Sequence, residues 1–320
     1  MVSASSKGII KQRTIEFAEK EHLIAYWPIA IVFCYKFLPF LEQEYAAIPE
    51  KERIGKGRVY IARAAVEGLF NYLKNRSVKN MEITPTSCLS FSQQVFSYAL
   101  ENKENFLRYL SIFLLAEVAK KDPSAFLTCE SQILVWANDK DWEVREITIE
   151  FVVNGVGYYP EIIIPRIREW VSSLNANIRR FGAEGLRPRG GTKWVRDPEQ
   201  NDEVLSLLGQ LRFDSSEYVR KSLSNNLKDL TKYMPQKILN LLKSWVQDAG
   251  IPVTSDLASK TKREIGADNY HLIYIVKKTL RWVKAKNPEL HPLVEKIIGA
   301  DYLRYFDEKK NILAKPKSSM

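Results

Sequence analysis

Apolar residues recur at helical spacing over most of the chain from about residue 85 onward. In the windows 101–121 and 202–211 they fall at positions i, i+3, i+4 and i+7, which is the pattern of a helix with one apolar face. Alternating patterns typical of strands are scarce. Prolines after short polar breaks interrupt the pattern at regular intervals, at Pro123, Pro160, Pro198, Pro235 and Pro288. Because proline fits the first turn of a helix, each break predicts a new helix and the chain is predicted to be all-α.

A weak internal repeat connects these helices. A β-branched residue followed by arginine occurs three times, at spacings of 34 and 41 residues, in Val144-Arg145, Ile178-Arg179 and Val219-Arg220. A weaker match, Leu107-Arg108, lies 37 residues before Val144. Helix pairs that recur at this spacing are typical of HEAT-like repeats, so we predict a HEAT-like helical-repeat solenoid, an α-α superhelix.

The repeat predicts an outer helix, a short turn and an inner helix in each unit. The outer helices are predicted at 124–137, 160–172, 201–212 and 235–247, and the inner helices at 141–154, 176–187, 216–231 and 269–284. Trp136, Trp170 and Trp245 end outer helices and are predicted to lie in the core. The polar insertion 248–268 is predicted to be a surface loop.

The chain is predicted to divide into a helical N-terminal cap without the repeat (1–84), the repeat domain (85–313) and a disordered tail (314–320). The most apolar run, 23–40, has a charge-free part that ends at Tyr35, which is short of the roughly 20 residues of a membrane span. It predicts a buried helix and no membrane role. The small, polar start of the chain predicts no targeting segment.

Composition favours a folded protein that meets a polyanion. Of 320 residues, 45% are hydrophobic and 11% aromatic, which excludes a disordered chain. There are 48 Lys and Arg against 38 Asp and Glu, a net charge of +10, and nucleic acid is the commonest partner for such a charge. The alternative, that the extra lysines only aid solubility, stays open.

Metal and cofactor chemistry is not expected. Cys34, Cys88 and Cys129 are odd in number and far apart, which argues against a disulfide scaffold and for a reducing, cytoplasmic compartment. The three histidines are also far apart, so no zinc site is expected. The sequence has no P-loop, GxGxxG, GxSxG or HExxH motif. Carboxylates and aromatic side chains are the remaining candidates for chemistry.

Acidic residues occupy equivalent positions of the predicted repeats. Six residues after the β-branched residue of each repeat stand Glu150, Glu184 and Asn225, and Asp229 lies one helical turn beyond Asn225. Such residues are expected to converge on the concave face of a solenoid. Trp142, Glu146 and Glu150 form a stripe at i, i+4 and i+8, which suits a cationic ligand. The alternative for this stripe is a solvated helix face.

A basic loop follows the second inner helix, in the segment FGAEGLRPRGGTKWVRDP (181–198). Its cations lie beside Trp194 and comprise Arg187, Arg189, Lys193 and Arg196. Arginines bind phosphates, glycines allow close approach and an aromatic ring can stack on a base. The loop is therefore a candidate contact for a nucleic-acid backbone, and the alternative is an ordinary inter-helix loop. Further cations would extend the positive surface: Lys260, Lys262, Arg263, Lys277, Lys278 and Arg281.

Two segments resemble the bacterial alkylpurine DNA glycosylases of the AlkC and AlkD type, most closely AlkC. AEGLRPR (183–189) is similar to their Ser-Glu-Gly-x-Arg-Pro-Arg segment, and SSEYVRKSLSNNLKDL (215–230) to their Tyr-Val-Arg-x-Ser-x-x-Asn-His-Leu-x-Asp segment. Glu150-Phe151 matches an earlier Glu-Phe of the family. The resemblance is specific over about residues 140–246 and implies a HEAT-like fold that acts in base-excision repair.

The resemblance implies a glycosylase that removes cationic N3- or N7-alkylated bases from duplex DNA by hydrolysis of the N-glycosidic bond. The implied catalytic acids are Glu150, Glu184, Asp229 and Glu146, with Trp142 or Trp194 as the aromatic contact. The implied DNA contacts are Arg145, Arg179, Arg187, Arg189, Lys193 and Arg220, although repeat arginines can instead brace neighbouring helices. Carboxylates would stabilise the positive charge that develops on the sugar. Duplex DNA is the expected partner of a monomeric chain.

This sequence departs from the family pattern at three places. Asn226 replaces the usual histidine, two extra residues precede Trp194, and the segment VVNGVG (152–157) replaces the family's Ile-Arg-Pro-Phe. These departures keep two alternatives open. One is a non-catalytic HEAT-like protein that binds DNA or RNA, and the other is a scaffold for protein interactions.

Overall fold

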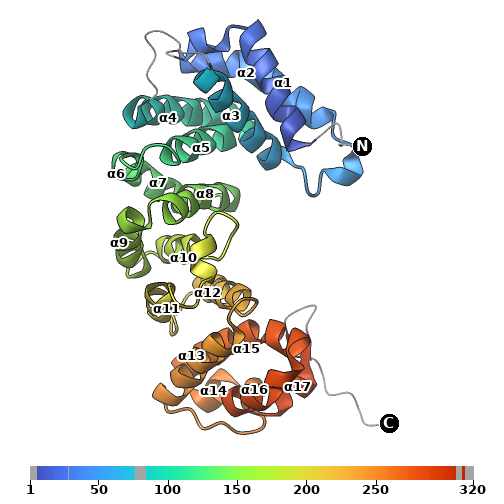
Figure 1. The fold of residues 1–320 in the computed structure, drawn as a ribbon, viewed down its shortest axis with the longest axis vertical. Coiled ribbons are helices and arrows are strands. Elements are labelled where there is room, and N and C mark those ends of the chain that lie inside the picture. The colour runs from blue at the N-terminus through green and yellow to red at the C-terminus, as the bar shows by residue number, and fades with distance from the viewer. Residues whose placement is uncertain (1–5, 28, 76–83, 308–311, 314–320) are drawn as a thin grey trace. The chain divides into compact units, whose positions relative to one another are not determined.

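The computed structural model describes residues 6–27, 29–75, 84–307 and 312–313 (Figure 1). The predicted disordered tail, 314–320, lies outside the described residues. The fold is helical apart from one antiparallel pair of two-residue strands, β1 (Phe306–Asp307) and β2 (Ile312–Leu313). This confirms the predicted all-α, helical-repeat class. The chain forms two compact units, Met1–Ile162 and Ile163–Met320, here called unit 1 and unit 2.

Unit 1 is built around α5 (Asn105–Ala119), a helix with nearly all of its side chains buried. It packs against α3, α4 and α8, and α1 covers α3. The N-terminal cap that was predicted for residues 1–84 therefore shares its hydrophobic core with helices that follow residue 84. The other elements are α1 (Lys7–Lys20), η1 (Leu23–Tyr26), α2 (Ala30–Ala46), η2 (Glu50–Glu52), α3 (Arg58–Asn75), α4 (Pro85–Asn102), α6 (Ala125–Thr128), α7 (Glu130–Ala137) and α8 (Trp142–Tyr158).

The apolar run 23–40 forms η1 and the first part of α2 rather than a single helix. One face of α2 is buried through Phe33, Phe37 and Leu41, whereas Tyr35 is 77% exposed. This is the pattern of an amphipathic helix on a globular core. Within the described residues, no helix combines the length and the apolar character that are needed to cross a bilayer.

Unit 2 consists of helix pairs in two layers, as the repeat predicts. An inner layer is formed by α10, α12 and α15, which contact one another in sequence order, and α9, α11 and α13 form the outer layer. Figure 1 shows α9 and α11 on one side and α10 and α12 on the other. The elements are α9 (Pro160–Val171), α10 (Ala176–Gly185), η3 (Lys193–Arg196), α11 (Asp202–Gly209), α12 (Glu217–Leu230), α13 (Pro235–Asp248), η4 (Leu257–Ser259), α14 (Lys262–Ile265), α15 (Ala267–Lys286), η5 (Pro288–Leu290), α16 (His291–Ile298) and α17 (Asp301–Tyr305).

Buried tryptophans and a glycine contribute to the close packing of the repeat helices. Trp136, Trp170 and Trp245 are at most 5% exposed, which confirms their prediction as core residues. A Cβ on Gly182 of α10 would lie 3.1 Å from Val171 of α9, so the lack of a side chain allows the two helices to approach.

The insertion 248–268 is not a surface loop throughout, and that prediction is wrong for its middle. It contains η4 and α14, and Ile251 and Leu257 are at most 5% exposed. Gly299 has a φ of +88°, and a Cβ there would lie 2.1 Å from the carbonyl oxygen of Thr254. Glycine at this position therefore allows the insertion to pack closely against the end of α16.

Candidate functional site

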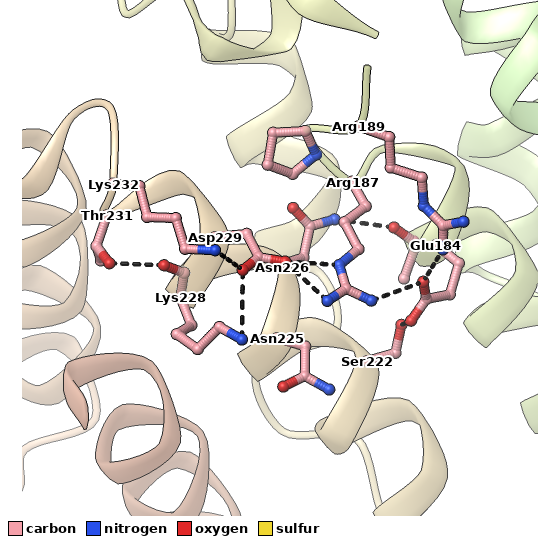
Figure 2. A network of polar contacts seen from close by, with 12 residues as sticks. Glu184, Arg187, Arg189, Ser222, Asn225, Asn226, Lys228, Asp229, Thr231 and Lys232 are labelled. Atoms are coloured by element: carbon pink, nitrogen blue, oxygen red, sulfur yellow. Dashed lines mark hydrogen bonds and ion pairs between the residues drawn. The ribbon is translucent and has the colours of Figure 1, made fainter. Parts of the chain in front are cut away.

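Two carboxylates of unit 2 meet at one guanidinium group (Figure 2). Glu184 lies in the last turn of α10, Asp229 lies in the last turn of α12, and Arg187 follows α10 directly. The Nε of Arg187 donates to Oδ2 of Asp229 at 2.8 Å, and its Nη2 lies 2.7 Å from the same oxygen. Its Nη1 lies 3.5 Å from Oε2 of Glu184. The structure thus brings Glu184 and Asp229 to the same cation.

Glu184 is enclosed by its partners and only 4% exposed. Its Oε1 accepts a hydrogen bond from Ser222 at 2.7 Å, and its Oε2 accepts one from Arg189 at 2.7 Å. Burial raises the pKa of Glu184, but Arg180, Ser222, Arg187 and Arg189 together lower it below the ordinary value. The carboxylate is therefore ionised at neutral pH, and both of its oxygens are engaged by partners within the protein. In this structure it holds Arg187 and Arg189 through ion pairs.

Asp229 is closer to solvent, with 13% of its side chain exposed. Its Oδ1 accepts a hydrogen bond from Lys232 at 2.8 Å and lies 3.3 Å from Nζ of Lys228. Burial raises the pKa of Asp229, but Lys232, Arg187 and Lys228 lower it below the ordinary value. Asp229 is thus a carboxylate that is ionised at neutral pH and lies between three cations.

The Arg-Pro-Arg loop is held by a buried threonine. Thr192 donates to the carbonyl oxygen of Arg187 at 2.7 Å and accepts from the backbone N–H of Arg189 at 2.9 Å. Arg196 donates to the carbonyl oxygen of Pro188 at 3.2 Å. Of the predicted cations of this loop, Arg187 and Arg189 turn toward carboxylates, whereas Lys193 is exposed. Trp194, the predicted aromatic contact, is half-buried on η3.

Asn226 occupies the position at which the resembling family has histidine. It is fully buried, and its Nδ2 donates to the carbonyl oxygen of Ala183 at 2.9 Å. Its Oδ1 has no hydrogen-bond partner among the described residues. Asn226 therefore ties α12 to α10 directly beneath the pair of carboxylates.

A cluster of cations lies beside this site on the inner layer, and we call it the α12–α15 cluster. Burial and the charges of Lys221 and Arg281 lower the pKa of Lys278. Burial, Arg281 and Lys232 also lower the pKa of Lys228, against the opposing effect of Asp229. Repulsion of this kind marks a surface at which a bound anion is stabilised. The members of the cluster are Lys221, Lys228, Lys232, Lys278 and Arg281.

Sequence analysis included Lys278 and Arg281 of this cluster and missed its lysines on α12. Lys221 and Lys228 are seven residues apart and Lys232 follows four residues later. This spacing places Lys221 and Lys228 on one face of α12 and was visible in the sequence, whereas Lys232 follows the end of the helix at Leu230. Aromatic rings accompany them, since Nζ of Lys232 lies 4.9 Å from the ring of Trp282.

The repeat arginines brace the turns of the fold. Arg145, Arg179 and Arg220 each donate through Nη1 to two carbonyl oxygens, five and six residues earlier, at 2.6–3.1 Å. Arg179 also binds Asp214 in the next turn, with Nε 2.6 Å from Oδ2. These contacts correspond to the bracing role that the sequence left open as an alternative, and the role of these arginines in DNA binding stays a prediction.

The stripe of Trp142, Glu146 and Glu150 lies on α8 in unit 1. Trp142 is 61% exposed, and Glu146 and Glu150 are partly exposed. Oε2 of Glu150 lies 2.8 Å from Nη2 of Arg63 on α3. Because Glu150 belongs to unit 1 and the other two acids to unit 2, the meeting of all three acids stays a prediction.

No metal cluster accompanies these carboxylates. Among the described residues, no group of three or more His, Cys, Asp and Glu side chains is arranged to hold a metal ion.

Comparisons with known proteins give a short sequence match and two likenesses of fold. No protein-family model matches the chain. Over 89 residues it is 34% identical to the uncharacterized protein YhaZ of Bacillus subtilis, a match that spans 27% of this chain and 24% of that protein. The chain is similar in fold to Pseudomonas fluorescens alkylpurine DNA glycosylase AlkC bound to DNA containing an abasic site analog. The two are 19% identical with a TM-score of 0.46, and the match covers 89% of this chain and 67% of the other. It is also similar to AlkD2 from Streptococcus mutans, with 23% identity, a TM-score of 0.44, and coverage of 66% and 89%.

The lowered pKa values of Glu184 and Asp229 predict a loss of stability in acid. A carboxyl group whose pKa is lower in the folded than in the unfolded state stabilises the fold. This stabilisation is complete above the unfolded-state pKa of about 4 and is lost as the pH falls from there through the folded-state pKa. We expect urea denaturation between pH 7 and pH 3 to show this loss, and Glu184→Gln to show a shallower dependence. If the stability of Glu184→Gln and that of the wild type depended on pH in the same way, the lowered pKa of Glu184 would be contradicted.

Proposed function

We propose that the protein binds duplex DNA through the α12–α15 cluster and acts in alkylation repair as a base-excision glycosylase. Lys228 and Lys232 of the cluster lie 3.3 Å and 2.8 Å from Oδ1 of Asp229, so phosphates bound there would lie next to an ionised carboxylate. The similarity of the segments 183–189 and 215–230 to alkylpurine DNA glycosylases supports the activity.

The proposed reaction is hydrolysis of the N-glycosidic bond of a cationic N3- or N7-alkylated purine. The base leaves as a neutral molecule with the electrons of the bond, and positive charge develops on the deoxyribose. Asp229, held ionised by its neighbours, would stabilise that charge, and water would add to the sugar. Glu184 would act as a positioning residue for Arg187 and Arg189 rather than at the sugar.

The observation that carries the proposal is the double engagement of Arg187 with Asp229 and Glu184. A guanidinium group that neutralises Asp229 without DNA is also a strong ligand for phosphate. A backbone phosphate would compete for Arg187 and thereby expose the charge of Asp229. Binding of DNA would in this way prepare the carboxylate for catalysis.

The experiment that tests the activity is release of bases from methylated duplex DNA by the purified protein. The proposal requires free 3-methyladenine or 7-methylguanine and a matching number of abasic sites. Absence of any released base, with duplex binding intact, would support the second candidate, a non-catalytic nucleic-acid-binding protein. The complete engagement of Glu184 in ion pairs favours that candidate.

Lys221→Ala and Lys278→Ala should each weaken duplex binding. Each lost phosphate contact should also reduce the slope of log K against log salt concentration by about 0.9. Arg168→Ala is the matched control, because Arg168 lies on the outer helix α9, is 62% exposed and pairs with Glu203. Fluorescence anisotropy titrations at several salt concentrations measure both quantities. If the slope of log K against log salt concentration were the same in the lysine variants and the wild type, the cluster would not be part of the DNA interface.

A further inference from the structure

A cavity of about 550 Å³ lies in unit 1 between the start of α3 and the helices α5 and α8. Its volume falls within the range of small-molecule sites, roughly 300–1,000 Å³. Sequence analysis assigned no role to residues 1–84, which supply most of its lining. Two arginines, three tyrosines and two hydrogen-bonding side chains face it, namely Arg58, Arg63, Tyr45, Tyr60, Tyr109, Asn105 and Glu143.

The arginines of the cavity lie over aromatic rings. The guanidinium carbon of Arg58 lies 4.5 Å from the ring centre of Tyr45, and that of Arg63 lies 5.1 Å from Phe113. Nη2 of Arg58 lies 3.5 Å from Oε2 of Glu42, and Nη2 of Arg63 lies 2.8 Å from Oε2 of Glu150. A guanidinium group carries five N–H donors, more than one carboxylate accepts. Both side chains are about 40% exposed, so these preorganised donors suit a phosphate group.

Helices α5 and α8 contribute hydrogen-bonding side chains to the cavity. The hydroxyl of Tyr109 donates to Oε2 of Glu143, and burial together with Glu143 raises the pKa of Tyr109, so the phenol stays protonated. Oδ1 of Asn105 accepts from Arg108 at 3.3 Å, and this bond orients its amide. A carboxylate and an amide offer acceptors and donors that match the edge of a nucleobase, and tyrosine rings offer faces for stacking.

The mouth of the cavity is formed by the turn before α3. Ile54 is 98% exposed, and a Cβ on Gly55 would meet nothing within 4 Å. An isoleucine exposed to this degree at the rim of a cavity provides apolar surface for a ring that enters it.

We propose that this cavity binds a nucleotide, with the phosphate at Arg58 and Arg63, the base against the tyrosines, and its edge at Glu143 and Asn105. A free nucleotide and a nucleotide of a DNA strand share this chemistry, and the experiment separates them. The proposal does not depend on DNA binding or base excision by unit 2.

Isothermal titration calorimetry of the full chain with dAMP, deoxyadenosine and inorganic phosphate tests the proposal, alongside a 5′-phosphorylated single strand. We expect dAMP to bind at least about tenfold more tightly than deoxyadenosine or phosphate, since both halves contribute. Arg58→Gln should weaken dAMP binding about tenfold. Arg13→Gln is the matched control, because Arg13 is 41% exposed, pairs with Glu44 at 3.2 Å and does not line the cavity.

The outcomes separate as follows for a variant that thermal denaturation shows to be folded. Binding of the strand but not of dAMP, weakened by Arg58→Gln, identifies a nucleotide of DNA as the ligand. Equal binding of phosphate and dAMP overturns the base half of the proposal, and equal binding of deoxyadenosine and dAMP overturns the phosphate half. No binding of either nucleotide source, or binding unchanged by Arg58→Gln, overturns the proposal as a whole. Loss of base excision by unit 2 changes none of the dAMP results.

Discussion

Glu184→Ala should lower the free energy of unfolding by about 3–5 kcal/mol, the usual loss when one partner of a buried ion pair is removed. The carboxylate is 4% exposed and faces Arg180, Arg187 and Arg189. Without it these cations repel one another in a region that water reaches poorly, and Ser222 loses its acceptor. Urea denaturation followed by circular dichroism measures the difference.

Glu217→Ala is the control for this variant. Glu217 stands on α12 and pairs with Lys221 at 2.7 Å, but its side chain is 59% exposed. An exposed pair of this kind contributes at most about 1 kcal/mol. A loss for Glu184→Ala no larger than that for Glu217→Ala would contradict the stabilising role of the buried network. Glu184→Gln should fall between the two, since it keeps an acceptor for Ser222 but not the charge.

The helices of unit 2 were predictable because their signals are local. Pro160 and Pro235 begin α9 and α13, and the inner helices α10 and α12 start within one residue of their predicted positions. The buried tryptophans follow from the same repeat. Periodicity and proline positions depend only on near neighbours in the chain, so a single sequence contains them.

Which charges neutralise one another was not predictable in the same way. Arg187 and Asp229 are 42 residues apart, and Arg179 and Asp214 are 35 apart, so their pairing depends on distances between helices. Local signals did exist in the i, i+4 pair of Arg180 and Glu184 and the i, i+3 pair of Glu184 and Arg187, and they indicated ion pairs rather than an exposed acid. The residues that line the proposed nucleotide cavity come from four separate segments of unit 1 and form no sequence motif.

Asp229→Asn should slow the release of 3-methyladenine from methylated duplex by about 10²-fold or more, the usual effect of removing one preorganised electrostatic group. The amide keeps a hydrogen-bond acceptor for Arg187 but loses the charge that would stabilise the sugar. The affinity for duplex DNA should be retained or rise slightly, because the substitution removes one negative charge from the surface that includes Lys228 and Lys232. Single-turnover assays at saturating enzyme measure release separately from binding.

Glu217→Gln is the control on the same helix, since it removes an exposed carboxylate that is also paired with a lysine. It should release base at the wild-type rate. A wild-type rate for Asp229→Asn would exclude Asp229 from the reaction, whatever the binding data. Loss of binding and rate together would instead mean that Asp229 acts by holding Arg187 in place, because a residue that acts only on the developing charge leaves ground-state affinity unchanged.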